Sequence, residues 1–359
     1  MGETSRAAGL TWMEKEAREA PKIIARQLME NASVWEALQL RLKELNTPYV
    51  GTIARGSSDH AATYAKYLIE TKANLPVVSI APSVMTLYGS HLKLHKSLVM
   101  AFSQSGKSPD ICEAFISAKH SGALTVAVIN QTLSPLAEAA DYVVPIWAGE
   151  EVSVAATKSY LGTLSAIAQF VAVITADPVL NKNLDFLPER LAQAFDCDGS
   201  ALIELLENKE TQKDILIVGR GYGYPIAQEA ALKCKETCAL HAEAFSTAEV
   251  LHGPFALIKP NFPVIFFAQN DPSFEANIAL AQRVKSLGGV AVIIANRDQA
   301  HRIPPNSCDY LLLAPASLHP ALDPLLMIQF FYLTIEKLAR ARGLDPDKPE
   351  HLKKITETR

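Results

Sequence analysis

The chain has 359 residues, too many for one ordinary hydrophobic core, so we expect two domains. Its net charge of -4, with no basic block, argues against nucleic acid as a partner. The longest apolar stretch, 161–176, is too short to span a membrane, and the N-terminus has no apolar signal segment. Five scattered cysteines indicate a reducing compartment, and the close pair Cys234 and Cys238 has no second cysteine or histidine pair at zinc spacing beside it. We therefore expect a cytoplasmic protein that contacts neither nucleic acid nor membrane and holds no metal.

In chain order, the first predicted elements are helices over 12–30, with Pro21 as a break or kink, and over about 34–45. Short β-rich runs then alternate with helical patterns, which predicts a doubly wound parallel sheet. These runs are Tyr49–Ala54, Pro76–Ile80, Leu98–Phe102, Leu124–Ile129 and Tyr142–Ile146. The apolar stretch 161–176 is predicted to be a buried helix.

A small polar loop, Ser103-Gln104-Ser105-Gly106, follows the third predicted strand and precedes Ser108-Pro109, a helix-start signal. Strand, small loop and helix N-terminus together form a geometry that binds anions through backbone N–H groups and hydroxyls. The loop is not a Walker motif, so a nucleotide is not implied. We interpret it as the site of a phosphate on a small molecule; taken alone, it could also be an ordinary strand-to-helix connection.

The second half of the chain repeats the first at a nearly constant shift. Ala54-Arg-Gly-Ser matches Gly219-Arg-Gly-Tyr, and Ala101-Phe-Ser-Gln104 matches Phe266-Phe-Ala-Gln269. The repeat predicts two tandem copies of one α/β domain. The second copy lacks the loop serines and instead carries many titratable groups between Glu229 and His252. We therefore expect one copy to bind phosphate and the other to transfer protons.

The motifs of both halves resemble the sugar isomerase (SIS) domains of glucosamine-6-phosphate synthase over nearly the whole chain. The resemblance implies two tandem flavodoxin-like domains, at 36–185 (phosphate-binding) and 200–340 (catalytic). A helical lead-in at 1–35 precedes them and a tail at 341–359 follows. The motifs are Arg55-Gly-Ser-Ser58, Ser103-Gln-Ser-Gly106, Val154-Ala-Ala-Thr-Lys158, Ala230-Ala-Leu-Lys-Cys-Lys-Glu236, His241-Ala-Glu-Ala244 and Leu251-His-Gly-Pro254.

The same resemblance implies the roles of individual residues. The phosphate is held by Ser103, Gln104, Ser105 and Ser108, and the sugar faces Gly56 and Ser58. Ala156 replaces a serine of the family motif, so one contact to the sugar is lost. Glu236 is the catalytic carboxylate, although taken alone it would be interpreted as a surface residue paired with Lys233 or Lys235. The remaining catalytic residues are Lys233 near the reacting end of the sugar, His252 for ring opening, and Lys354 as the Schiff-base lysine.

The resemblance also implies a homodimer with shared active sites, because in the family the histidine comes from the neighbouring subunit. No cofactor is expected. Because Met1 is followed by Gly2, the sequence predicts a stand-alone enzyme without the glutaminase domain of the synthase. We therefore predict a deaminase that converts glucosamine 6-phosphate to fructose 6-phosphate and ammonia. Three alternatives stay open: a deglycase of 6-phosphorylated fructosamines, an isomerase without nitrogen loss, and a non-catalytic sugar-phosphate sensor.

Overall fold

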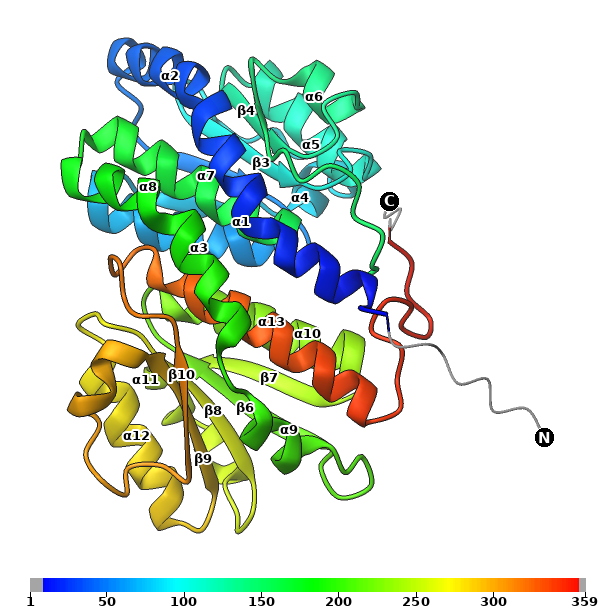
Figure 1. Cartoon of the computed structure of the whole chain (residues 1–359). Coiled ribbons are helices and arrows are strands. Elements are labelled where there is room, and N and C mark those ends of the chain that lie inside the picture. Colours follow the sequence, from blue (N-terminus) through cyan, green and yellow to red (C-terminus); the bar gives the residue numbers. More distant parts are fainter. Residues whose placement is uncertain (1–8, 355–359) are drawn as a thin grey trace.

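The computed structural model describes residues 9–354 and contains two five-stranded sheets with helices on both faces (Figure 1). Residues 1–8 of the predicted lead-in and residues 355–359 of the predicted tail lie outside the described part of the chain. The predicted fold class, two tandem doubly wound α/β domains, is confirmed.

In the first sheet all strands are parallel and follow the order β2-β1-β3-β4-β5. This is the flavodoxin-like order, in which the chain reverses its winding direction between β1 and β3. Each strand predicted from the sequence is present. The bounds are β1 (Val50–Ile53), β2 (Val77–Ser79), β3 (Leu98–Ser103), β4 (Leu124–Ile129) and β5 (Tyr142–Pro145).

The second sheet repeats this arrangement, with parallel strands in the order β7-β6-β8-β9-β10. Counted from the first strand of each sheet, the two orders are the same, which accounts for the repeat seen in the sequence. The bounds are β6 (Asp214–Gly219), β7 (His241–Ser246), β8 (Pro263–Ala268), β9 (Val290–Asn296) and β10 (Tyr310–Ala314).

The central strands are apolar throughout because both faces of each sheet are covered. In β3, Leu98, Met100 and Phe102 pack into the core between the sheets, whereas Val99 and Ala101 pack against helices on the opposite face. This alternation follows from the two-residue period of a strand. A parallel strand buried on both faces therefore reads as a continuous apolar run.

Long helices lie between the two sheets (Figure 1), and the shorter helices at 32–45 and 200–206 join the same core, whereas the helices at 82–86, 109–120, 135–139, 247–250 and 274–286 cover the outer faces. The inner helices share one continuous apolar core, and α3 contacts α10 directly across the junction of the two domains. The inner helices are α1 (Trp12–Glu30), α3 (Ser57–Ala73), α7 (Lys158–Thr175), α8 (Pro178–Ala192), α10 (Gly223–Cys238) and α13 (Asp323–Ala341). The others are α2 (Ala32–Leu45), α4 (Pro82–Thr86), α5 (Pro109–His120), α6 (Pro135–Ala139), α9 (Ser200–Leu206), α11 (Thr247–Val250), α12 (Phe274–Ser286) and the 3-10 helices η1 (Gln193–Asp196), η2 (Pro254–Leu257) and η3 (Arg297–Arg302).

Pro21 does not break the first helix, contrary to one option of the sequence prediction. Helix α1 runs from Trp12 to Glu30 with Pro21 inside it. A proline removes the hydrogen bond to the carbonyl four residues earlier, here that of Ala17. The side chain of Gln329 on α13 donates to this carbonyl at 2.8 Å and so replaces the missing bond. Tertiary packing thus offsets the local cost of the proline.

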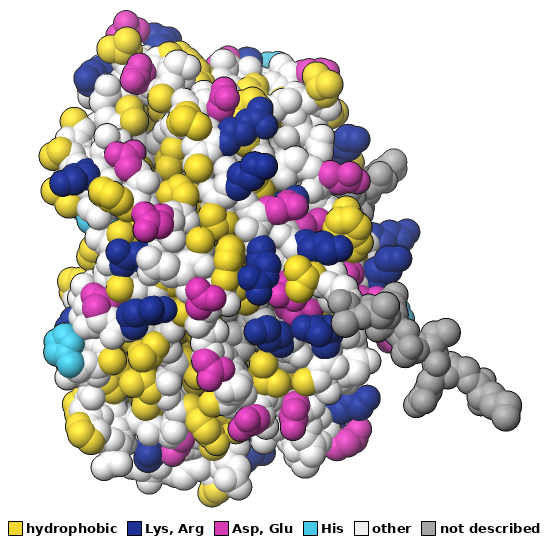
Figure 2. Space-filling view, viewed as in Figure 1, with side chains coloured by type: hydrophobic (Ala, Val, Ile, Leu, Met, Phe, Trp, Pro, Cys, Tyr) yellow, Lys and Arg dark blue, Asp and Glu magenta, His cyan; other side chains and the backbone are white. Residues whose placement is uncertain are grey.

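The predicted buried helix at 161–176 is confirmed as α7, most of whose side chains are buried. Among the helices of residues 9–354, none combines the length and the apolar character needed to cross a bilayer. On the face shown in Figure 2, acidic and basic side chains are interspersed with apolar ones.

Candidate active site

Two loops meet where the winding of the first sheet reverses. The β1 loop (residues 54–56) connects β1 to α3, and the β3 loop (residues 104–108) connects β3 to α5. Because β1 and β3 are neighbours and their helices pack on opposite faces, a crevice opens at the carboxyl ends of these strands. Gly56 and Ser108 are the N-cap residues of α3 and α5, so two helix N-termini border the crevice.

The crevice contains a cavity of about 360 Å³, within the size range of small-molecule sites. It is lined by both loops, by the segment after β5, by α10 and by the C-terminal tail. Most of the site residues predicted from the sequence lie in its wall: Gly56, Ser58, Ser103, Gln104, Ser105, Ser108, Ala156, Glu236 and Lys354. Two predicted residues, Lys233 and His252, do not line it.

The β3 loop holds its shape through its own small side chains. The hydroxyl of Ser103 accepts a hydrogen bond from the backbone N–H of Gly106 at 2.9 Å. Ser108 stands at the N-cap of α5, yet its hydroxyl makes no capping hydrogen bond. This hydroxyl, together with the N–H groups of the first turn of α5, can therefore donate to an anion in the cavity.

Gly106 is required by the backbone of this loop, since its φ is +65°. A Cβ atom there would lie 2.3 Å from both Ile129 Cδ1 and Ser134 Oγ. We expect Gly106→Ala to destabilise the protein by at least about 1–2 kcal/mol, the usual cost of a left-handed alanine. The displaced loop should also raise KM for a phosphorylated substrate by about 10-fold, the loss of roughly one hydrogen bond.

Gly89→Ala is the matched control, because Gly89 has a φ of +59° but open space around its Cα. It shares the backbone strain without the clash and lies outside the cavity wall. Thermal unfolding of both variants measures the loss of stability, and steady-state kinetics measures the change in KM. Equal KM values for the two variants would show that the β3 loop does not need this geometry.

Arg55 ties the two loops together and was given no role by the sequence. Its Nε and Nη2 atoms donate to Asp110 Oδ2 at 3.1 and 3.0 Å. Asp110 is buried in the first turn of α5, whereas the Arg55 side chain is half-exposed and borders the cavity. The ion pair therefore fixes the β1 loop against the helix that follows the β3 loop, and places a guanidinium beside the cavity.

Glu236 projects from α10 of the second domain into the cavity of the first. Its Oε2 atom accepts from Lys233 Nζ at 2.5 Å. Lys233 is fully buried behind Glu236 and also contacts Glu229 Oε1 at 3.2 Å. Burial lowers the pKa of Lys233, but the two carboxylates raise it by more, so the amine is held as an ammonium. Lys233 thus contacts Glu236 from the protein interior and does not line the cavity.

Lys354 reaches the cavity from the C-terminal tail and is paired with a buried carboxylate. Its Nζ donates to Glu151 Oε2 at 2.8 Å and to the carbonyl of Ser153 at 2.7 Å. Burial raises the pKa of Glu151, but Lys354 and the hydrogen bonds from Ser159 and the Thr157 N–H lower it by more, to below its ordinary value. Lys354 is therefore held in an ion pair with Glu151 in this structure.

The tail is held over the first domain by further contacts. The carbonyl of Asp347 accepts from the N–H of Val154 at 3.1 Å. The carboxylate of Asp347 accepts from the N–H groups of Trp12 and Met13 at 2.9 and 2.8 Å, at the start of α1. Neither Asp347 nor Glu151 was predicted to take part. A Glu-Glu pair just before the Val154–Lys158 motif was the available signal for Glu151.

His252 lies on the surface of its own chain, in the exposed turn between α11 and η2. Leu251 and Leu257, on either side of it, are 49% and 50% exposed. This stretch therefore presents an imidazole and two large apolar side chains to the outside, away from the wall of the cavity.

The corresponding loop of the second sheet is occupied by a carboxylate of the chain itself. Asp271 follows β8 and accepts from Ser273 N and Ser273 Oγ at 2.7 and 2.5 Å. The side chain of Gln269 also donates to Asp271. A negative charge at this position repels a phosphate, so the second copy is unsuited to bind one. This carboxylate distinguishes the loop of the second copy from the β3 loop of the first.

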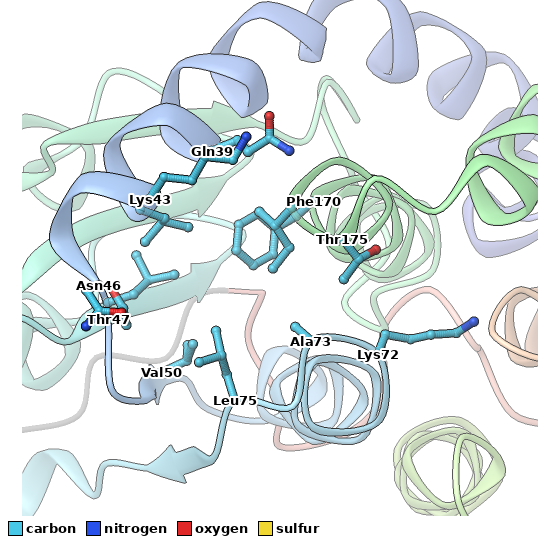
Figure 3. A pocket seen from close by; sticks show the side chains of 13 residues that line it. Gln39, Lys43, Asn46, Thr47, Val50, Lys72, Ala73, Leu75, Phe170 and Thr175 are labelled. Atoms are coloured by element: carbon cyan, nitrogen blue, oxygen red, sulfur yellow. The ribbon is translucent and has the colours of Figure 1, made fainter.

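A second recess of about 400 Å³ lies at the opposite edge of the first sheet, near the amino ends of β1 and β3 (Figure 3). Phe170, Val50 and Leu75 contribute apolar side chains to it. Its wall has two lysines, Lys43 and Lys72, and no carboxylate or imidazole. Lys72 is paired with Asp177 at 3.1 Å. Without a carboxylate or an imidazole, this recess is a poor candidate for catalysis. Among residues 9–354, no group of three or more His, Cys, Asp or Glu side chains could hold a metal ion.

Comparisons with known proteins agree with the family predicted from the motifs. The SIS domain model matches residues 49–173 and 210–328. The glutamine–fructose-6-phosphate aminotransferase (isomerizing) of Methanothermobacter thermautotrophicus is 31% identical over 345 residues, which cover 96% of this chain and 57% of that relative. The chain thus spans little more than half the length of this relative.

Two solved structures are similar over almost the entire chain. One is from Silicibacter pomeroyi DSS-3 and carries a provisional assignment as a phosphosugar isomerase. It has a TM-score of 0.87 and 36% identity, and the match covers 94% of this chain and all of that one. The other is the C-terminal domain of glucosamine-fructose-6-phosphate aminotransferase from Francisella tularensis, with a TM-score of 0.85, 25% identity, and coverage of 97% of this chain and 100% of that one. The chain belongs to the SIS domain family.

Proposed function

We propose that the protein is an enzyme that converts glucosamine 6-phosphate and water to fructose 6-phosphate and ammonia. One observation carries this proposal: the anion-binding β3 loop and the carboxylate of Glu236 line the same cavity. One end of the cavity thus has a loop suited to a phosphate, and the other end has a base. This arrangement suits a phosphosugar whose reacting carbons lie far from its phosphate. The relatives named for fructose 6-phosphate chemistry support the substrate class.

The phosphate docks on the β3 loop, with Ser103, Gln104, Ser105 and Ser108 as its partners. Gly56 and Ser58, at the N-terminus of α3, face the sugar. Ala156 contributes only a methyl group to the wall, so the sugar has one polar contact fewer there than the family motif provides. Docking at two helix N-termini fixes the substrate so that its reacting carbons point toward Glu236.

The chemistry moves protons and one water molecule. His252 opens the ring by passing the proton of the anomeric hydroxyl to the ring oxygen. Glu236 removes the proton at C2, and the electron pair forms the C1–C2 double bond of an enolamine as the C1 oxygen gains a proton. Return of a proton to C1 gives an imine at C2. Water adds to this carbon, the C–N bond breaks, and ammonia leaves fructose 6-phosphate.

Within this scheme, His252 acts from a second copy of the chain in a homodimer. His252 lies outside the cavity of its own chain, and the half-exposed Leu251 and Leu257 beside it favour a surface that a second copy covers. If Lys354 forms a Schiff base with the keto sugar, it must first lose a proton. Glu151, whose Oε2 lies 2.8 Å from Lys354 Nζ, is the carboxylate placed to take that proton.

A second candidate is a deglycase that cleaves the 6-phosphorylated fructosamine of an amino acid. The guanidinium of Arg55 and the side chain of Lys353 line the cavity in addition to Lys354. These extra cations suit a substrate with a carboxylate besides its phosphate.

The test is an ammonia-release assay on the purified protein with glucosamine 6-phosphate, its epimers and a 6-phosphorylated fructosamine, with fructose 6-phosphate measured in parallel. We expect equal amounts of ammonia and fructose 6-phosphate from glucosamine 6-phosphate. Release of a free amino acid from the fructosamine, without ammonia from glucosamine 6-phosphate, would instead establish the deglycase. Tight binding of these sugars without turnover would overturn both the deaminase and the deglycase proposals. The protein would then be a non-catalytic sugar-phosphate sensor.

A further inference from the structure

We propose that Glu229 is a positioning residue of this active site: it fixes Lys233, which in turn fixes the carboxylate of Glu236, and it does so from the junction of the two domains. The inference rests on the proposed function. The residues involved, called the Glu229 cluster below, are Ser57, His60, Glu229, Lys233 and Tyr332.

Glu229 is a carboxylate without solvent contact that is fully supplied with partners. Ser57 Oγ and Tyr332 OH donate to its Oε1 at 3.1 and 3.0 Å, and Lys233 Nζ lies 3.2 Å from the same atom. Its Oε2 lies 2.9 Å from His60 Nδ1. Burial raises the pKa of Glu229, but Lys233, His60 and Ser57 lower it by more. The carboxylate is therefore charged and held from several sides.

The partners of Glu229 come from separate parts of the fold. Ser57 and His60 belong to the first two turns of α3 in the first domain, directly after Gly56 of the cavity wall. Glu229 and Lys233 are one turn apart on α10, and Tyr332 belongs to α13. The cluster thus binds the helix that carries Glu236 to the helix whose N-terminus borders the cavity. Its geometry sets how Glu236 stands relative to a docked substrate.

Stability alone is a weak explanation for such a cluster. A buried ion pair contributes little net stability, because desolvation of both charges offsets their attraction, and an apolar pair often serves as well. A carboxylate with four ordered partners does, however, fix an ammonium in one place. Lys233 then presents a hydrogen bond of 2.5 Å to Glu236 Oε2. That bond restricts the rotamer of Glu236, whose side chain lines the cavity.

The variant that tests this role is Glu229→Gln, which keeps the shape and removes the charge. We expect kcat to fall by about 100-fold, the cost of misplacing a reacting group by about 1 Å. KM should stay within about 3-fold, since the phosphate loop is untouched and uniform binding is kept. If the substitution only impaired folding, the amount of folded protein would fall instead. The kcat of the folded fraction would then stay at the wild-type value.

Glu336→Gln is the matched control. Glu336 is also fully buried, also lies on a helix and also pairs with a basic residue at i+4, since Arg340 Nε lies 2.7 Å from its Oε1. It has no place in the cavity wall. We expect it to change stability and leave kcat unaltered. Should Glu229→Gln not fold, His60→Gln and Tyr332→Phe each remove one contact to Glu229, and each should lower kcat by about 10-fold at constant KM.

A second measurement needs no substrate. In protein labelled with ¹³C at lysine Cε, the signal of Lys233 is identified by its absence in Lys233→Arg, and its titration is followed to high pH. We expect the ammonium to persist above the range in which ordinary lysines titrate, and Glu229→Gln to lower the Lys233 pKa by at least about one unit.

The two readouts separate the possible failures. If the wild-type protein turns over no phosphosugar, the proposed function falls, and the titration still decides whether Glu229 fixes Lys233. An unchanged titration in Glu229→Gln would overturn the inference. A normal kcat in that variant, in a wild-type background that is active, would overturn it equally.

Discussion

Glu236→Gln is expected to lower kcat for ammonia release by about 10³-fold, within the range for loss of a general base. The amide keeps the size of the side chain, and its oxygen can still accept from Lys233 at the position of the carboxylate. It cannot take the proton at C2. KM should change little, because the β3 loop that docks the phosphate is unaffected. Coupled assays of ammonia and fructose 6-phosphate give both constants.

The control for this variant is Glu204→Gln, at an exposed position of α9 that is far along the chain from either loop of the cavity. It should match the wild type in both kcat and KM. A Glu236→Gln protein with more than about a tenth of the wild-type kcat would remove Glu236 from the proposed role, because even a weak general base contributes about 10²-fold.

The same variant tests whether active sites are shared between subunits. Glu236→Gln and His252→Asn should each be inactive alone. If each site takes Glu236 from one copy and His252 from the other, a mixed dimer has one intact site. With equal amounts of both chains, half of the dimers are mixed, so activity should recover to about a quarter of the wild-type value. No recovery in isolated mixed dimers would mean that both residues act within one chain.

Most of the fold can be predicted from the sequence, because the patterns that mark its strands and helices are local. The alternation of apolar runs and helical patterns marks each strand, and the constant shift between Ala54 and Gly219 or between Ala101 and Phe266 marks two copies with the same strand order. The loop after β3 is also a local signal, since Ser103 to Pro109 are contiguous. The motifs for α10 identify Glu236 and Lys233 as neighbours on a helix.

The sequence does not reveal how the site is held together, because the contacts that hold it join distant residues. His60 and Glu229 are 169 positions apart, and Glu151 and Lys354 are 203 apart. Glu229 has no pattern of its own, because a glutamate at i−4 from Lys233 looks like an ordinary surface helix pair. Only the packing of α3 against α10 turns that pair into a buried cluster behind Glu236.

Lys233→Met is expected to have the largest effect on stability, a loss of about 3–5 kcal/mol in the free energy of unfolding, as when one partner of a buried ion pair is removed. The methionine fills most of the space, but Glu229 is left without its cation in a position with no solvent contact. The double variant Glu229→Gln/Lys233→Met removes both charges. It should recover much of the lost stability and none of the lost kcat, because Glu236 still lacks its support.

The pH dependence of Lys233→Met distinguishes a stranded charge from a poorly packed side chain. In the wild type the pKa of Glu229 is lowered, so its contribution to stability persists until the pH falls below the unfolded-state pKa. Without Lys233, burial dominates and the folded-state pKa rises above the unfolded one, so the penalty is present at pH 8 and shrinks as the pH falls toward 5. Glu16 and Asp323, whose pKa values burial raises to about 7, add a trend of the same sign in both proteins. The quantity to follow by urea unfolding is therefore the difference between wild type and variant. A difference that stays constant between pH 8 and pH 5 would mean that Lys233 acts through packing, and that Glu229 needs no cation to remain charged.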